Sequence, residues 1–180
     1  DSWASQVPEG FRFSIKASRR ITHFARLQEA ARDPTEYLLS TLGALGPKLG
    51  AILFQMPPNL KADVERLRDF LEMLPSRTPG AFEFRHESWK DPAVYDLLRA
   101  RDMAWVCADA DEAGEDEAIV STAPWGYLRL RRADYQDADL TRWAAQVAAT
   151  GWSRAFVFFK HEDEGAGPRL AARFLEVAQG

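Results

Sequence analysis

Charged side chains recur at alternate positions inside apolar-rich stretches of this chain. In the segment AFEFRH (81–86), Glu83 and Arg85 fall on one face, because strand side chains alternate with a period of two. Two further segments show the same pattern, which groups Arg12, Ser14 and Lys16 in 11–16, and Tyr127, Arg129 and Arg131 in 127–131. The alternation predicts that several strands share one polar interior, and this interior is the main indication of function.

Strand-like runs alternate with segments of helical period, which is typical of parallel βα units. The predicted strands are 11–16, 51–56, 81–85, 104–109, 127–131 and 155–159. The predicted helices are 34–45, 61–74, 92–101, 140–150 and 168–178. Asp33-Pro34 and Asp91-Pro92 each predict a helix N-cap followed by proline. Asn59 is expected to cap the helix that follows the second strand, and 110–117 is expected to be a loop.

Length and composition favour a single globular domain over residues 1–180, with a net charge of −4. A net negative charge argues against binding of nucleic acid over the whole protein surface, although it allows a local basic cleft. Cys107 is the one cysteine, so the chain has no internal disulfide and a reducing cytoplasm is the expected location. No apolar run approaches the ~20 residues that span a bilayer, so we expect no membrane association.

Several longer segments are more specific than a generic βα pattern. They are VPEGFRF (7–13), KASR (16–19), ITH (21–23), LFQMPPN (53–59), FEFRH (82–86) with Ser88-Trp89, YLRL (127–130) and FFKH (158–161). Together these segments resemble the DUF72 family, also called the YecE-like family, over nearly the whole chain. The resemblance implies a TIM-type βα barrel and leaves the activity open.

The chain departs from that family at its start, where the first four residues resemble the end of a helix and two earlier βα units are missing. A closed eight-stranded barrel usually takes ~250 residues, so 180 residues with six strands predict an incomplete barrel. The chain is then a fragment, or an open or partner-completed barrel. Exposed strand edges would favour self-association. After Leu130, Arg131 and Arg132 replace a His-Gly pair that many relatives carry.

Functional groups of βα barrels gather at the C-terminal ends of the strands, and this rule selects the candidate site. The predicted ligand-binding residues are Lys16, Arg85, Arg129, Lys160, Gln55 and Trp89, and the predicted catalytic residues are Glu83, Asp109, His86 and His161. The cations suit a phosphate or carboxylate, while Glu83 and Asp109 suit a general base and acid. The alternative is an internal salt-bridge network in which these carboxylates only neutralise the cations.

The favoured function is an enzyme that acts on a small anionic substrate, such as a phosphorylated sugar or nucleotide. One alternative is a non-catalytic module that binds an anion or a nucleic-acid end, although nucleic acid is not favoured. Another is a metal-dependent hydrolase or isomerase that uses His23, His86 and His161 with Glu83 or Asp109. No metal or other cofactor is predicted, because the chain carries no paired-ligand spacing, phosphate loop or dinucleotide fingerprint.

Overall fold

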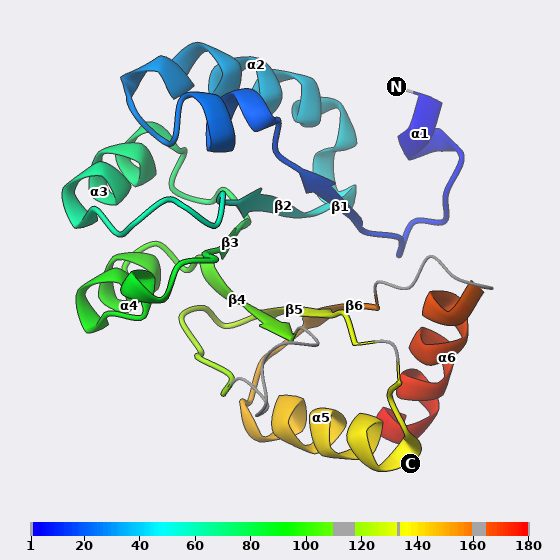
Figure 1. Ribbon diagram of the computed structural model, residues 1–180. Helices are drawn as coiled ribbons and strands as arrows, with labels where there is room; N and C mark the ends of the chain where they lie inside the picture. Colours follow the sequence, from blue (N-terminus) through cyan, green and yellow to red (C-terminus); the bar gives the residue numbers. More distant parts are fainter. Residues whose placement is uncertain (1, 110–117, 133, 160–164, 180) are drawn as a thin grey trace. The chain divides into compact units, whose positions relative to one another are not determined.

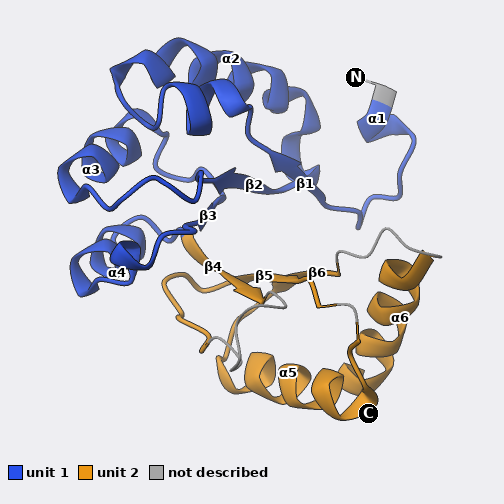
Figure 2. Ribbon diagram, in the orientation of Figure 1, with its two compact units in different colours: residues 1–103 blue, residues 104–180 orange. Residues whose placement is uncertain are grey.

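A computed structural model of the chain describes residues 2–109, 118–132, 134–159 and 165–179. The chain divides into two compact units, which are residues 1–103 and 104–180 (Figures 1 and 2). The six strands in the described residues pair in parallel within each unit, and helices separate consecutive strands except β4 and β5. This is an α/β fold, consistent with an incomplete TIM-type barrel. The single domain that the sequence predicts stays a prediction.

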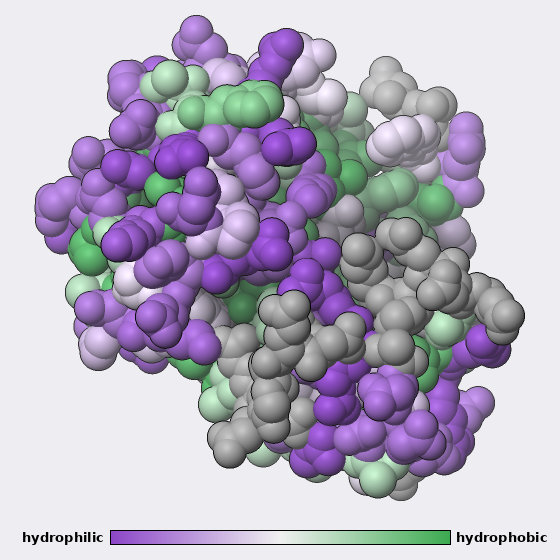
Figure 3. Space-filling view, in the orientation of Figure 1, coloured by the Kyte–Doolittle hydropathy of each residue, from purple (hydrophilic) through white to green (hydrophobic). Residues whose placement is uncertain are grey.

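Unit 1 contains a parallel sheet with its helices. Its strands are β1 (Phe13–Lys16), β2 (Leu49–Gln55) and β3 (Gly80–Glu83). Its α-helices are α1 (Ser2–Ser5), α2 (Arg32–Leu42), α3 (Val64–Met73) and α4 (Pro92–Arg99). Shorter helical segments are η1 (Arg20–Phe24), η2 (Glu29–Ala31), η3 (Gly43–Lys48) and η4 (Glu87–Trp89). Hydrophilic residues cover most of the surface over α3 and α4 (Figure 3).

The two faces of the unit 1 sheet differ in polarity, as the alternation in the sequence predicts. On one face, Phe54 and Phe82 stack with their ring centroids 4.9 Å apart, and Phe70 of α3 packs edge-on against Phe54 at 5.4 Å. The next residue after each of these strand aromatics is polar, namely Gln55 and Glu83. The aromatic face fixes the sheet against its helices, so the polar face is the one that can form a site.

Unit 2 repeats this arrangement with β4 (Ala104–Asp109), β5 (Gly126–Leu130), β6 (Ala155–Phe159), α5 (Asp137–Ala149) and α6 (Ala166–Gln179). Both helices pack on the same side of the sheet (Figure 1). Their core includes Leu128, Leu130, Trp143 and Phe174, all buried. These residues remove a large apolar area from water and hold α5 and α6 against the strands.

Most predicted elements are confirmed, with boundaries that shift by a few residues. The strands over 104–109 and 155–159 are confirmed, whereas β3 ends at Glu83 and leaves Arg85 beyond it. Asp91 caps α4, because its carboxylate accepts a hydrogen bond from the Ala93 N–H at 2.8 Å. The predicted loop over 110–117 lies outside the described residues.

Two predicted helix caps are wrong for local reasons. Asp33 lies inside the first turn of α2, because η2 leads directly into α2 and the backbone is already helical at Ala31. Asn59 does not cap α3, since a turn from Pro57 to Leu60 delays the start of the helix. Asp63 is the cap instead, and its carboxylate accepts from the Arg66 N–H at 3.0 Å.

One glycine in β5 is required by a close approach. A Cβ atom at Gly126 would lie 2.0 Å from the nearest ring carbon of Trp152. The indole is held in place, because its Nε1 donates to Ser121 Oγ at 2.8 Å and its ring packs against the core of unit 2. Gly126 therefore makes room for the aromatic side chain that closes this end of the core.

We expect Gly126→Ala to lower the free energy of unfolding by about 1–3 kcal/mol, because the added methyl group forces the indole of Trp152 to move. Urea denaturation of the two proteins measures the difference. Gly43→Ala is the control, since a Cβ there meets no atom within 4 Å and the change should stay within ~0.5 kcal/mol. Equal effects of the two substitutions would contradict this account of Gly126.

Candidate functional site

A chain of hydrogen bonds joins the C-terminal ends of the three strands of unit 1. Lys16 Nζ donates to Gln55 Oε1 at 2.7 Å, and Gln55 Nε2 donates to Glu83 Oε1 at 2.9 Å. The strand register explains these contacts, because Gln55 lies directly opposite Glu83 and Lys16 lies opposite Leu53, one step back on the same face. Parallel strands thus bring together three residues that the sequence selects for the site.

The orientation of the Gln55 amide follows from its two neighbours. An ammonium group only donates, so the amide oxygen must face Lys16 and the amide nitrogen must face Glu83. The carboxylate of Glu83 is fully buried and Gln55 is 9% exposed. A buried carboxylate needs such a donor, and a group held in this way can exchange a proton in a reaction.

The connection that follows β1 carries a half-buried histidine in an unusual backbone. His23 lies in η1, a π-helical turn, and its Nδ1 is 2.8 Å from the hydroxyl oxygen of Thr22. Burial lowers the pKa of His23 below its ordinary value. The positive charges of Arg19, Lys16, Arg85 and Arg26 lower it further. The imidazole is therefore neutral near pH 7, in a strongly positive environment.

Backbone strain follows immediately after this turn. Arg26 and Leu27 are consecutive non-glycine residues in the left-handed region, with φ values of 49° and 61°. Each residue there costs roughly 1 kcal/mol or more, and such strain clusters at functional sites. It is held by packing, since Leu27 is fully buried and its N–H donates to the Ile21 carbonyl at 3.1 Å. Arg26 is not among the residues that the sequence predicts for the site, because no sequence pattern signals a left-handed arginine.

The residues after β3 divide between the surface and the core. Arg85 is exposed. His86 caps η4, because its Nδ1 accepts a hydrogen bond from the Ser88 N–H at 3.2 Å. Trp89 is fully buried, donates to the Leu60 carbonyl at 2.7 Å and stacks on Phe84 at 4.2 Å. These contacts give Trp89 a place in the packing of the loop, with no surface left for a ligand.

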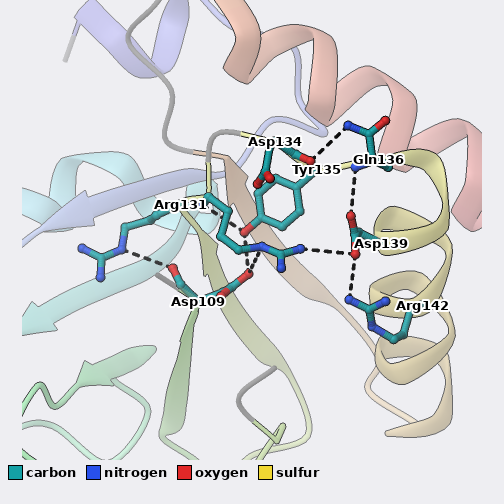
Figure 4. Close-up of polar contacts among 8 residues, drawn as sticks. Asp109, Arg131, Asp134, Tyr135, Gln136, Asp139 and Arg142 are labelled. Atoms are coloured by element: carbon teal, nitrogen blue, oxygen red, sulfur yellow. Dashed lines mark hydrogen bonds and ion pairs between the residues drawn. The ribbon is translucent and has the colours of Figure 1, made fainter. Parts of the chain in front are cut away.

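In unit 2 the polar residues form a different arrangement, centred on buried Asp109 (Figure 4). Tyr135 donates its hydroxyl hydrogen to Asp109 Oδ2 at 2.7 Å, and Arg132 Nε lies 3.2 Å from the same oxygen. Arg132 also pairs with Asp139 at 3.3 Å, and Asp139 pairs with Arg142 at 2.8 Å. Asp109 thus belongs to a network in which the charges are matched by partners.

The pKa shifts in this network agree with its geometry. Burial raises the pKa of Tyr135 well above its ordinary value, and the hydrogen bond to Asp109 raises it further. Burial by itself would lower the pKa of Arg132, but the charges of Asp109 and Asp139 raise it. The Gln136 N–H holds the pKa of Asp139 below its ordinary value, with the help of two arginines. These shifts favour the charged forms of Arg132 and Asp139 and the neutral form of Tyr135, as an internal ion-pair cluster should.

Strand register separates Asp109 from Arg129. Asp109 lies opposite Leu130, whose side chain belongs to the core beneath α5 and α6. Arg129 lies opposite Ala108 and Phe158, one residue out of step, and so it projects from the other face of the sheet. The sequence predicts both residues for one site, because both lie near the C-terminal ends of strands. The end of a strand does not by itself show which face of the sheet a side chain takes. The predicted Lys160 and His161 lie outside the described residues.

Two pockets lie elsewhere on unit 1, apart from the Lys16–Gln55–Glu83 chain. The larger, about 430 Å³, lies between the start of η1 and α2 and is lined by residues that include Arg20, Asp33 and Tyr37. The other, about 340 Å³, lies between η2 and α3. Among the residues that the structure describes, no three His, Cys, Asp or Glu side chains gather as a metal site would require. Nor is any helix in this part of the chain long and apolar enough to cross a membrane.

A family model described as "Protein of unknown function DUF72" matches residues 1–180. The chain belongs to the DUF72 family. UPF0759 protein YunF of Bacillus subtilis (strain 168) is 30% identical over 132 residues, which are 68% of this chain and 46% of YunF. This DUF72 chain therefore spans about half the length of that curated relative.

Solved DUF72 structures share the fold. A DUF72 family protein of Thermotoga maritima MSB8 matches with a TM-score of 0.85 and 21% identity, over 99% of this chain and 78% of its own. One from Enterococcus faecalis V583 matches with a TM-score of 0.83 and 18% identity, again over 99% and 78% of the two chains. The resemblance that the sequence motifs indicate is thereby confirmed for the family and its fold.

We expect Asp109→Asn to lower the free energy of unfolding by about 1.5–3 kcal/mol, because Arg132 and Tyr135 lose a charged, buried partner. Chemical denaturation measures this change. Asp137→Asn is the control in the same unit, since its pair with Arg173 is exposed and should contribute about 0–1 kcal/mol. If the two substitutions destabilise the protein equally, the Asp109 network is not a main support of unit 2.

Proposed function

We propose that this DUF72 chain is an enzyme that acts on a small anionic substrate, a phosphorylated sugar or nucleotide, at the C-terminal ends of its strands. The observation that carries the proposal is the hydrogen-bond chain from Lys16 through Gln55 to Glu83. It combines a cation, a fixed amide and a buried carboxylate at the end of the sheet where βα barrels carry their sites.

Each member of this chain has a chemical role in the proposal. Glu83 exchanges a proton with the substrate, as a general base or acid in a water-poor position. Gln55 holds the carboxylate in one orientation. Lys16 and Arg85 bind the anionic group, because an ammonium and a guanidinium form charge-assisted hydrogen bonds with phosphate oxygens. The substrate anion thus binds near the group that carries out the proton transfer.

The side chain of Arg85 favours a bound ligand over an internal ion-pair network. Arg85 forms no ion pair with any carboxylate in the described part of the chain. Asp109, in contrast, is held by Arg132 and Tyr135, so we assign it to structure and not to catalysis. We also leave out His86 and Trp89, because the first caps η4 and the second is buried.

Other parts of the expected function stay predictions. These are the ligand role of Arg129, the roles of Lys160 and His161, and self-association through strand edges. A reducing cytoplasm suits the proposed enzyme, because Cys107 is a buried free thiol. A non-catalytic module that binds the same anion would use the same cations, so the decisive question is whether Glu83 takes part in turnover.

Glu83→Gln is expected to keep the ligand and to lose turnover by about 10²–10⁴-fold, because the amide preserves the shape of the side chain and cannot exchange the proton. The ligand is found first, by thermal unfolding of the wild-type chain with phosphates, sugar phosphates, nucleotides and divalent metals. An anion at a concentration of ~100 times its dissociation constant should raise the free energy of unfolding by ~2.7 kcal/mol.

Glu87→Gln is the matched control, since Glu87 is exposed in η4 and the variant should keep both ligand and turnover. Unchanged turnover in Glu83→Gln would remove Glu83 from the mechanism. A ligand without any turnover would favour the binding module. A cooperative transition that no compound shifts would favour internal salt bridges, and stabilisation by a divalent metal alone would favour the metal-dependent alternative.

A further inference from the structure

The larger pocket of unit 1 lies beside the C-terminal end of β1. Its volume is about 430 Å³, and its lining comes from the start of η1 and from α2. Ser18, which lines the pocket, follows Lys16 by two residues, so the chain between them spans at most about 7 Å. A ligand in this pocket therefore lies close to the cation that ends β1.

Helical periodicity places the pocket residues of α2 on one face of the helix. Asp33, Tyr37 and Thr41 follow one another at intervals of four residues, and Pro34 and Leu38 lie beside them. The side chain of Tyr37 is 76% exposed, so its ring is available to a ligand. This face offers a carboxylate at one end and an aromatic ring one helical turn further on.

The η1 side of the pocket carries Arg20, whose backbone is held in a fixed turn. Its N–H donates to Ser18 Oγ at 3.2 Å, and its carbonyl accepts from the Ala25 N–H at 2.9 Å. The next residue, Ile21, is fully buried. Within the described residues, Arg20 forms no ion pair with Asp33, although both line the same pocket. A ligand between them can therefore contact both charged groups.

The lining determines which donors and acceptors a ligand must present. A guanidinium only donates hydrogen bonds and a carboxylate only accepts them, while an apolar lining with an aromatic ring suits a planar ring system. Guanine matches both charged groups twice. Its O6 and N7 atoms accept from the two prongs of an arginine, and its N1–H and N2–H groups donate to the two oxygens of a carboxylate. Adenine presents only one acceptor and one amino group on the corresponding edge.

We infer that this pocket binds the guanine base of a nucleotide, with Arg20 and Asp33 hydrogen-bonded to its edge and Tyr37 stacked on its face. The inference rests on the proposed function, because it names the base of that substrate and leaves the phosphate to Lys16. The spacing on α2 suits this arrangement, since residues four apart on a helix lie about 5–6 Å from one another. A base that stacks on the ring of Tyr37 then has its edge at the carboxylate of Asp33.

Isothermal titration calorimetry of the full chain with GMP, AMP and ribose 5-phosphate tests the inference. Ribose 5-phosphate carries the phosphate without a base, and AMP carries the wrong purine. We expect GMP to bind about tenfold more tightly than either of the other compounds, because a good bidentate contact discriminates against a wrong base by roughly that factor or more.

Asp33→Asn should change which purine the pocket prefers. The amide of asparagine donates where the carboxylate only accepts, so it opposes the amino group of guanine and matches the carbonyl oxygen that XMP carries in its place. We expect this variant to bind GMP about tenfold more weakly than the wild-type chain does, and to bind XMP more tightly than GMP. A merely structural role of Asp33 would weaken both nucleotides alike.

Two matched controls accompany these measurements. Tyr37→Ala should weaken binding of GMP on the order of tenfold, because it removes the stacked ring, whereas Tyr37→Phe keeps the ring and should keep the affinity. Asp69→Asn is the control for Asp33→Asn, since Asp69 is exposed in α3 and lines the other pocket. It should leave the affinities for GMP and XMP unchanged.

Equal affinities for GMP and AMP, or GMP binding that Asp33→Asn and Tyr37→Ala leave unchanged, would overturn the inference. The proposed enzyme would then still stand, with a phosphorylated sugar as its substrate. The same holds if GMP does not bind. Guanine-selective binding together with normal turnover in Glu83→Gln would support the pocket and refute the proposed catalytic role.

Discussion

A carboxylate stays buried in a sheet only when hydrogen-bond donors reach it, and at the ends of β2 and β3 the Gln55 amide is one such donor to Glu83. Gln55 donates to Glu83 while its oxygen accepts from Lys16, so three strand ends are tied together through side chains. The contact depends on the register of the parallel strands, which places Gln55 and Glu83 opposite one another. The aromatic packing on the other face fixes that register, and the chemistry of unit 1 follows from it.

The two units differ in whether their buried and strand-end charges are paired within the protein. In unit 2, Asp109 is surrounded by Tyr135 and Arg132, and the network closes through Asp139. The charges of such a cluster neutralise one another, and the main effect of the cluster is on the stability and uniqueness of the local fold. In unit 1, Arg85 follows β3, is exposed and has no carboxylate partner among the described residues. Excess charge of one sign at a strand end is what anion binding requires.

His23 lies in an unusual backbone turn and in a positive electrostatic environment. His23 lies in the π-helical turn of η1, and two left-handed residues follow this turn, of which Leu27 is fully buried. Strain of this kind persists only where packing holds it, and it fixes a group that would otherwise move. Burial lowers the pKa of His23, and the positive charges of Arg19, Lys16, Arg85 and Arg26 lower it further, so the neutral imidazole is favoured there.

The sequence by itself determined the βα order, the strands over 104–109 and 155–159, and the grouping of Lys16, Gln55 and Glu83, because local periodicity controls which face a side chain takes. It determined the family as well, through its longer motifs. Only the tertiary structure decided which charges are neutralised, since the partners of Asp109 lie 23 to 26 residues away on the turn before α5. The role of Trp89 and the left-handed backbone at Arg26 were likewise set by packing against distant residues, and local sequence patterns carry no record of such contacts.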